Sequence, residues 1–420
     1  MECPDRCAEP ANSLTLEEAQ ARIRECVPPL SDVEDVPLKQ ARGRVLAESL
    51  TAPFDLPPFP NSAMDGYAFH HAGISNHADA SLTVIGTSFA GKPYDGVPGP
   101  RECVRIFTGA AIPTGADTVI MQEDVIRETD NIRLAKTVTA MANVRPAGDE
   151  IRRGECLLEQ GKVLQAADLG VLASAGFAKA TVTRRLRVAF FSTGDELRPV
   201  EEPLDFGQIH DSNRYLLHGL LDDPAIEAID KGVVPDDAAA LKQALLDASQ
   251  QADVIISTGG VSVGDADFVT SALAELGRIE FWKVAVKPGK PFAFGRIGPA
   301  WFFGLPGNPV AVMVTFRQLV RPALLRMIGA QARPPLRLRA ICRSRLKKAP
   351  GRLEFQRGQF EADGEGGFTV IGLAGQGSHQ LLGMSRANCL IVLGAGNAGV
   401  KPGDSVEIEP FLEFFQLTSL

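Results

Sequence analysis

The sequence has few aromatic residues, no excess of positive charge and no closely spaced cysteine pair. Aromatic residues make up 6% of the 420 residues, and 43 lysines and arginines face 51 acidic residues, for a net charge of -8. This balance argues against nucleic-acid binding, which requires the neutralisation of many phosphates. Wholesale disorder is also excluded, because 45% of the residues are hydrophobic and only 22% are charged.

The seven cysteines are scattered along the chain and include no C-x-x-C pair. An odd, dispersed set of thiols is typical of a reducing compartment and not of a disulfide framework. Glu2 and Asp5 precede no apolar run, so we expect no secretory signal and a cytoplasmic location. The six histidines form no cluster with metal-ligand spacing, and no serine-hydrolase nucleophile elbow is present.

One uncharged stretch, between Arg296 and Arg317, is long enough to cross a bilayer. Three prolines interrupt it, so it cannot form one continuous helix. We therefore expect a buried strand, a tight loop and the start of a helix here, and no membrane among the partners.

Changes in patterning along the chain predict several domains. Short apolar runs between turn residues follow residue 51, helical spacing returns near residue 147, and strands and helices alternate after residue 185. A helix is expected over 15–27, where Thr15 and Glu18 form a capping box, and a second one over 37–50. The expected domains are a discontinuous linker domain (1–50 and 147–184), a mostly-β domain (51–146), an α/β domain (185–331) and a C-terminal β domain (332–420).

Alternation of strands and helices predicts a mostly parallel sheet in the α/β domain, with helices on both faces. Ligands of such sheets bind beyond the carboxyl ends of the strands. Two of these ends are alike, because Phe191–Gly194 and Ile256–Gly259 both finish with Ser-Thr-Gly. Glycine turns of this kind, above all Thr258–Gly264, suit phosphate binding, although two tight turns without a ligand would explain the pattern too.

Lysines and acids accumulate near the same predicted edge. Lys283 and Lys287 share one face of an otherwise apolar predicted strand, and Lys290 follows in a Pro-Gly turn. A solvated edge strand is the alternative, but flanking apolar residues favour anion binding. Acids follow several predicted strand ends and could hold Mg²⁺ beside a phosphate, while capping of helices accounts for any single one. These acids are Asp195, Glu196, Asp236, Asp237, Asp265 and Asp267.

Eight motifs in collinear order resemble the MoeA family of molybdenum cofactor biosynthesis. The family also includes the corresponding domains of gephyrin and its plant counterpart. The motifs cover about residues 14–415, and their agreement in order is far more specific than any one of them. They are Pro60–Ala68, Arg105–Ala110 with Gly115–Asp117, Phe191–Leu197, Asp211–Asn213, Ser257–Gly264, Lys287–Pro291, Gly304–Pro309 and Gln376–Ser378.

The resemblance implies a transferase that inserts molybdate into adenylylated molybdopterin and releases AMP and molybdenum cofactor. It implies a homodimer of four-domain subunits, Mg²⁺ as cofactor, and a molybdopterin adenylyltransferase as a possible protein partner. The implied fold combines a three-layer α/β/α molybdopterin-binding domain, a mixed helical linker domain, a mostly-β domain and a C-terminal β-barrel-like domain. The cleft would lie between the α/β domain of one subunit and the β domain of the other.

The resemblance also implies residue roles. Catalytic positions are Asp65 (from the partner subunit), Thr108, Glu196, Lys283 and Lys287. Binding positions are Thr258, Gly259, Gly260, Ser262, Gly264, Lys287, Lys290, Pro306, Pro309, Arg357 and Ser378. Metal positions are Glu196, Asp236 and Asp267.

Two departures from the family pattern stand out. Asp149 and Glu150 occur in the order opposite to the family's usual Glu-Asp, and Ala311 replaces a frequent serine that could donate a hydroxyl to molybdate. Two other functions are compatible with parts of the sequence. The α/β domain resembles molybdopterin adenylyltransferases, and gephyrin-like scaffolding is the alternative from a different class, although no linker or low-complexity arm is present for it.

Overall fold

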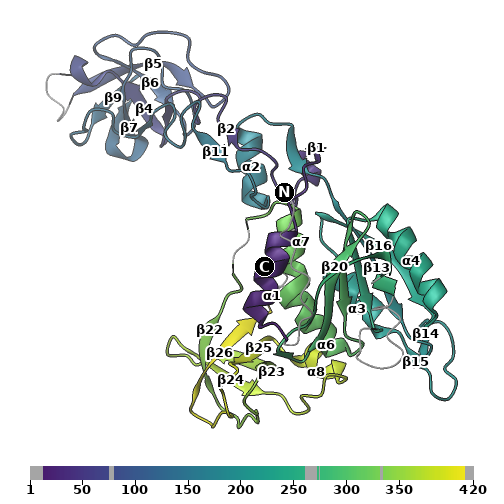
Figure 1. Cartoon of the computed structure of the whole chain (residues 1–420). Helices are drawn as coiled ribbons and strands as arrows, with labels where there is room; N and C mark the ends of the chain where they lie inside the picture. The colour runs from purple at the N-terminus through teal and green to yellow at the C-terminus, as the bar shows by residue number, and fades with distance from the viewer. Residues whose placement is uncertain (1–12, 75–79, 261–271, 274, 332–333, 412–420) are drawn as a thin grey trace.

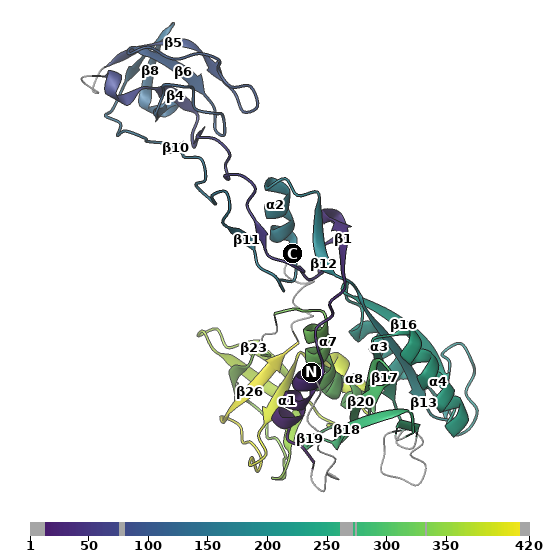
Figure 2. The same ribbon diagram turned by 45° about the horizontal axis from the view of Figure 1, so that its top comes forward.

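The computed structural model describes residues 13–74, 80–260, 272–273, 275–331 and 334–411. The chain is elongated (Figures 1 and 2), with a β-rich region at one end. An α/β sheet and a β-barrel lie side by side at the other end, and a small connecting region with α2 lies between the two ends. The expected fold class, several domains combining α/β and β architecture, is confirmed.

The β-rich region is built around a six-stranded sheet of order β7-β4-β6-β5-β9-β8. Its core contains Tyr67, Phe69, Leu82 and Ile120, and confirms the expectation of a mostly-β unit. The strands of this region, of which β3 and β10 form a separate two-stranded sheet, are β3 (Asn61–Ser62), β4 (Gly66–Phe69), β5 (Ser81–Ser88), β6 (Glu102–Ile106), β7 (Thr118–Met121), β8 (Val125–Glu128), β9 (Asn131–Leu134) and β10 (Val144–Arg145).

The connecting region combines segments that precede and follow the β-rich region in the sequence. Antiparallel pairing joins β1 (Val33–Pro37) to β12 (Lys179–Thr183), and β2 (Leu50–Thr51) to β11 (Cys156–Leu158). Helix α2 (Ala166–Ser174) is the only helical part of residues 147–184, where helical spacing led us to expect more helix.

The helix expected over 37–50 is wrong, because only a 3-10 turn, Leu38–Gln40, forms there. Gly43 has a φ of +78°, and a side chain at this position would approach Cγ of Pro224 to 2.7 Å. A left-handed residue ends helical geometry. Beyond it the backbone pairs across the connecting region, as Leu46 bridges Val182.

The α/β sheet has the order β16-β13-β17-β21-β20-β18. Its first four strands are parallel to one another, and β20 is antiparallel to both of its neighbours, β21 and β18. The mostly parallel sheet is therefore confirmed. The chain runs from β13 outward to β16 and then returns to the other side of β13, which makes the β13–β17 edge a topological switch point. The strands are β13 (Leu186–Thr193), β16 (Ile226–Val234), β17 (Val254–Thr258), β18 (Gly277–Lys283), β20 (Pro291–Ile297) and β21 (Ala300–Leu305).

Helices cover both faces of this sheet. Phe191 packs with Leu245 of α4 (Ala238–Gln251) in one core, whereas Phe190 packs with Leu217 of α3 (Ser212–Leu220) in another. Successive strand residues point to opposite faces, so these two phenylalanines mark the two interfaces of a three-layer unit. The second core also receives α1 (Leu16–Cys26), which starts with the expected capping box.

Two expectations inside the α/β unit need correction. The single strand expected to carry both Lys283 and Lys287 is divided, because β18 ends at Lys283 and a separate two-residue strand, β19 (Val286–Lys287), pairs elsewhere. The antiparallel strand β20 was not expected at all. The stretch free of charge does form a strand, a loop and a helix, but the helix contains a π-turn (Phe316–Val320) between α6 (Pro309–Thr315) and α7 (Arg321–Met327).

The C-terminal unit is a closed five-stranded barrel, in which β23–β24–β22–β26–β25 form a ring closed by β23–β25 pairing. A Gly-rich turn over residues 363–367 joins β23 and β24 as a hairpin. The strands are β22 (Leu338–Cys342), β23 (Leu353–Ala362), β24 (Phe368–Gly372), β25 (Cys389–Leu393) and β26 (Ser405–Pro410), with the unexpected helix α8 (Leu381–Arg386) between β24 and β25.

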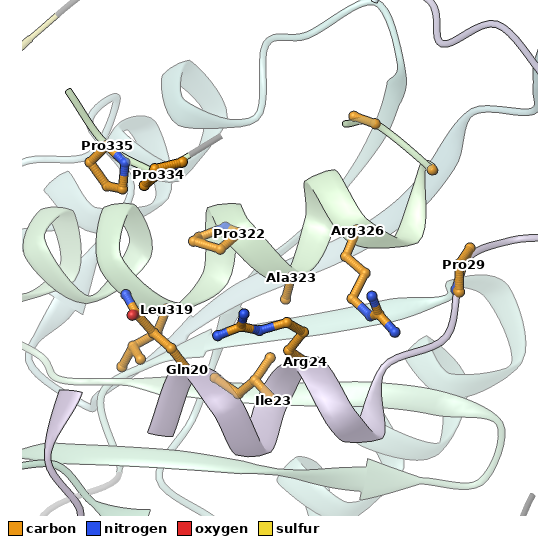
Figure 3. A pocket seen from close by; sticks show the side chains of 12 residues that line it. Gln20, Ile23, Arg24, Pro29, Leu319, Pro322, Ala323, Arg326, Pro334 and Pro335 are labelled. Atoms are coloured by element: carbon orange, nitrogen blue, oxygen red, sulfur yellow. The ribbon is translucent and has the colours of Figure 1, made fainter. Parts of the chain in front are cut away.

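A groove of about 470 Å³ is lined by residues of both α1 and α7 (Figure 3). Ile23 and Ala323 form its floor, Pro334 and Pro335 border it, and Arg326 Nε donates a hydrogen bond to the Val27 carbonyl at 2.7 Å. The groove is mainly apolar and carries none of the residues that the sequence nominates for chemistry.

Several cysteines of the described ranges are thiols. Cys103, Cys342 and Cys389 are buried, and Cys156 is exposed. Burial raises the pKa of Cys103 and of Cys389 to about 12, so both stay protonated near neutral pH. Across the same ranges, every helix is too short or too polar to cross a bilayer.

Glu409 should be a key residue in the attachment of the barrel. Its fully buried carboxylate accepts a hydrogen bond from Gln318 of the π-turn at 2.6 Å and pairs with Arg337 at 3.1 Å. Glu409→Ala leaves Gln318 buried without its partner, so we expect a loss of about 2–3 kcal/mol in unfolding free energy, measured by urea denaturation. Glu407→Ala, on the exposed face of the same strand, should change it by less than about 0.5 kcal/mol, and equal losses would contradict this role.

Candidate functional site

Three turns meet at the carboxyl ends of the parallel strands β13, β17 and β21. The Gly259 N–H donates to the Leu305 carbonyl at 3.2 Å, which joins two of these turns. Gly259 has a φ of +86°, and a Cβ there would overlap the Thr193 carbonyl oxygen in the third turn. A Cβ on Gly307 would lie 3.7 Å from Gly259 Cα. Only glycine permits this close approach of backbones, which leaves peptide groups at the edge of the sheet.

Buried hydroxyl groups connect the same strand ends. Thr258 Oγ1 donates to Ser192 Oγ at 3.0 Å, and Ser192 in turn donates to Asp211 Oδ1 at 3.0 Å. The Thr258 hydroxyl is therefore turned into the fold, so a binding role for this residue would use its backbone.

Asp211 and Asn213 hold a position at the site that the sequence did not assign to them. Asp211 caps α3 through the Arg214 N–H, and its second oxygen, Oδ2, is buried with no partner among the described residues. Asn213 donates to the Gly307 carbonyl at 2.7 Å and so fixes the turn that follows β21. Their motif was recognised, but only the folded chain reveals what the two side chains hold.

Two of the three nominated metal positions lie at this edge. Thr193 Oγ1 donates to Asp236 Oδ1 at 2.5 Å, and the Asp236 N–H donates to Asp195 Oδ1 at 3.1 Å. The Glu196 carboxylate folds over Gly194, where a Cβ would lie 2.6 Å from Oε2. The third position, Asp267, lies outside the described residues, as do Ser262 and Gly264. Within the described ranges no group of three potential metal ligands comes together.

The lysine segment (residues 283–290, with Lys283, Lys287 and Lys290) crosses from the α/β sheet to the barrel. Strand β19 pairs with β23 in parallel, which places Lys287 opposite Glu354. Lys287 Nζ lies 3.2 Å from Glu354 Oε1, yet half of the lysine side chain is exposed (52%), so its ammonium group also faces solvent. Lys290 is exposed three residues later, and Lys283 is half-buried at the end of β18. Gly289 packs against Thr315 of α6 between them.

Arg357 builds a loop of the barrel. Its fully buried guanidinium donates to the carbonyls of Gly375 (2.6 Å), Gly377 (3.1 Å) and Gln380 (2.7 Å). Burial also lowers the pKa of Arg357. In this structure the guanidinium therefore shapes the loop that carries Ser378, and does not project toward a ligand.

The Ser378 loop is seated on the start of α6. The Val310 N–H donates to the Ser378 carbonyl at 3.1 Å. Pro309 occupies the first turn of α6 as expected, while Pro306 is buried in the preceding turn. Asn308 is the N-cap residue, but its side chain makes no capping hydrogen bond. The barrel loop thus reaches the same turns that end the parallel strands.

Asp65 and Thr108 form a second cluster, on the β-rich region. Asp65 Oδ1 accepts hydrogen bonds from the N–H and the hydroxyl of Thr108, both at 2.8 Å. These two donors, with Arg105 nearby, hold the pKa of Asp65 below its usual range and keep it ionised. Arg105 itself lies over the rings of Tyr67 and Phe107, each 4.9 Å from its Cζ.

The two clusters are not brought together within one chain. In both views the β-rich region lies at the far end from the α/β sheet and the barrel (Figures 1 and 2). Gly259, Lys287, Lys290 and Ser378 belong to one neighbourhood, whereas Asp65 belongs to the other.

Comparison with known families divides the chain into three consecutive matches. Residues 14–176 match the MoeA N-terminal region (domain I and II), residues 189–326 a probable molybdopterin binding domain, and residues 339–411 the MoeA C-terminal region (domain IV).

Full-length relatives agree with these matches. A Haemophilus influenzae protein named molybdopterin molybdenumtransferase is 43% identical over 95% of this chain and 98% of its own length. A Nostoc protein of the same name is 37% identical over 89% of this chain and 88% of its own length. The crystal structure of a molybdopterin biosynthesis MoeA protein from Pyrococcus horikoshii is 30% identical, superimposes with a TM-score of 0.83, and covers 95% of this chain and 100% of its own.

The Asp65–Thr108 pair allows a direct test of electrostatics. Thr108→Val removes the hydroxyl donor but keeps the backbone N–H, so the pKa of Asp65 should rise toward its usual value in a carboxylate titration followed by NMR. Thr108→Ser retains the hydroxyl and should leave the pKa low. An unchanged pKa in the valine variant would show that the hydroxyl does not stabilise the carboxylate.

The Gly259 turn should not tolerate a side chain. Gly259→Ala combines a left-handed backbone with overlap at the Thr193 carbonyl, so we expect a loss of more than about 2 kcal/mol in unfolding free energy. Gly364→Ala is the matched control, because Gly364 has a φ of +83° with no atom near its Cβ position. It should cost only about 1 kcal/mol. Similar losses in both variants would mean that the three turns can separate.

Proposed function

Because the chain belongs to the MoeA family, we propose that it is a molybdopterin molybdenumtransferase that inserts molybdate into adenylylated molybdopterin and releases AMP and molybdenum cofactor. The observation that supports this most is the meeting of three elements: the glycine turns, the lysine segment and the Ser378 loop. Each supplies a different kind of donor. Backbone N–H groups, ammonium groups and a hydroxyl group are the donors that a pyrophosphate and a molybdate dianion need.

The phosphate end of the substrate would lie against the turns at the carboxyl ends of β13, β17 and β21. Gly259 and Gly260 both have left-handed backbones, and neither has a side chain to cover its peptide groups. Oxyanions bind readily in such concave backbone turns at a switch point of an α/β sheet. In this proposal the turns fix the substrate before any bond changes.

Molybdate would be held by Lys287, Lys290 and Ser378. Lys287 is restrained by Glu354 but remains half-exposed, so its ammonium can accept a second anionic partner. Arg357 would act indirectly, because it determines the conformation of the loop that carries Ser378. The lysines and the loop would thus hold molybdate close to the dithiolene sulfurs, which replace oxygen at molybdenum.

Glu196 and Asp236 would hold Mg²⁺. Both lie at the sheet edge, and Mg²⁺ is commonly bound by one or two carboxylates together with water and substrate phosphates. When bound there, the ion would neutralise charge on the phosphoanhydride that is cleaved. Thr193 keeps the Asp236 carboxylate in place through its hydroxyl.

A complete site would require two subunits. Asp65 and Thr108 lie at the far end of the chain from Lys287, so the partner subunit's Asp65 would have to enter the cleft of a homodimer. Its depressed pKa would keep it a carboxylate, suited to orienting cationic groups in the cleft. Catalysis would consist mainly of positioning and charge neutralisation.

A subunit-mixing experiment tests the activity and the shared site together. Asp65→Asn and Lys287→Ala are each expected to lower AMP release from adenylylated molybdopterin and molybdate by orders of magnitude as homodimers. In a heterodimer of the two, one cleft would retain both Asp65 and Lys287. Random pairing should therefore restore about a quarter of the wild-type rate.

Three results would contradict the proposal. Near-normal activity of both variants would remove the site assignment, and no recovery on mixing would place the complete site within one chain. Formation of adenylylated molybdopterin from ATP, without cofactor assembly, would instead support an adenylyltransferase. Size-exclusion chromatography of each variant controls for loss of the dimer.

A further inference from the structure

A second cavity, of about 490 Å³, lies at the opposite end of β13 from the proposed active site. Its lining includes Arg184 and Arg185, where the chain passes from β12 of the connecting region into β13 of the α/β sheet. Its lining is strongly polar and includes no aromatic ring. Arginines and glutamates make up most of it: Arg44, Arg184, Arg185, Arg187, Glu34 and Glu227.

Two of these arginines are fixed by acids. Arg184 makes a two-pronged contact with Asp253 at 2.8 and 2.9 Å and also contacts Asp32 at 2.9 Å. Arg44 is almost fully buried and donates to Glu34 and to the Thr183 carbonyl. Its Nε is also buried, and has no acceptor within the part of the chain that the structure describes. Arg44 therefore retains one unused donor.

The other two arginines are underused. Arg187 lies 3.8 Å from Asp253, which Arg184 already occupies, and the Arg187 side chain is 46% exposed. Arg185 is exposed and has no ion pair within 4.0 Å across the described ranges. Neither of these two guanidinium groups has an acid to itself within hydrogen-bond distance among the described residues, although Glu34 interacts electrostatically with Arg185 and Glu227 lies opposite Arg187.

We propose that this cavity binds a tetrahedral oxyanion of the phosphate class. Guanidinium groups match phosphate oxygens through paired N–H donors, and Arg185 and Arg187 supply such donors at the cavity, while Arg44 offers only its single buried Nε–H. The absence of an aromatic surface in the lining offers no place for a base to stack. The volume exceeds that of one phosphate, so the ion would be held with water molecules.

Glu227 sets the strength of this site. It lies opposite Arg187 in the β13–β16 register and, like Glu34, lines the same cavity. Glu34 already pairs with Arg44, but Glu227 has no ion pair among the described residues and would repel a dianion. We therefore expect modest affinity in the natural chain, limited by this one carboxylate.

A bound anion would join parts of the chain on both sides of the junction. Arg44 belongs to the connecting region, whereas Arg187 and Glu227 belong to the α/β sheet. An ion held by Arg44 and Arg187 together would restrain the orientation of the two units. The site does not depend on the proposed transferase activity, because none of its residues lies at the carboxyl edge of the sheet.

Isothermal titration calorimetry of the full chain with inorganic phosphate, at constant ionic strength, tests the proposal. Arg185→Ala combined with Arg187→Ala should weaken phosphate binding at least about tenfold, because two charge-assisted contacts disappear. Glu227→Gln should strengthen binding several-fold, because it removes the repulsive charge. Opposite effects from neighbouring residues are not expected of general screening. Circular dichroism verifies that both variants remain folded.

Two controls separate this cavity from other anion sites. Arg339→Ala combined with Arg345→Ala removes two exposed barrel arginines and should not change phosphate binding. Lys287→Ala combined with Lys290→Ala removes the lysines of the proposed active site, and the phosphate binding that remains in this variant should still require Arg185 and Arg187. AMP used as a second probe in that lysine variant distinguishes the source: similar affinity indicates inorganic phosphate, and markedly tighter binding that still requires the arginines indicates a phosphate monoester. Parent-like phosphate binding by the Arg185/Arg187 variant, or no binding by the parent, would overturn the proposal.

Discussion

The structure of the candidate site depends on the pairing of β19 with β23. These two residues of β19 leave the α/β sheet and join the barrel, so that Lys287 comes to lie opposite the buried carboxylate of Glu354. A buried carboxylate needs a partner, and the lysine supplies one at the surface between the two units. The contact between Val310 and Ser378 closes the same interface from the side of α6. These two links place the barrel loop beside the glycine turns.

Local patterns predicted the parts of the fold that local forces determine. The capping box of Thr15 and Glu18 begins a helix where the sequence predicts one. The helix expected over 37–50 failed because its apolar spacing serves pairing across the connecting region, beyond a left-handed Gly43. Strand β20 was missed for a related reason: its antiparallel place between β18 and β21 is set by partners distant in the sequence.

The candidate site also combines features that short stretches of sequence determine with features that only the whole fold determines. Glycine turns and paired lysines follow from short motifs, because both depend on the chemistry of adjacent residues. The role of Arg357 could not be predicted from a short motif. Its charge suggests a ligand contact, whereas its buried guanidinium donates hydrogen bonds to the carbonyls of a loop. The distance between Asp65 and Lys287 is likewise a property of the whole elongated chain. Sequence similarity identifies both residues, and only the three-dimensional arrangement separates them.

The β-rich region is joined to the remainder by extended segments, of which β2 and β11 contribute a short two-stranded ladder. This attachment is narrow, and the whole β-rich region lies beyond it. A small rotation at this ladder would displace Asp65, which directly precedes β4 in the β-rich region, farther than atoms close to the ladder. In the proposed homodimer, access to the shared cleft would then depend on the β2–β11 ladder, which lies away from the substrate.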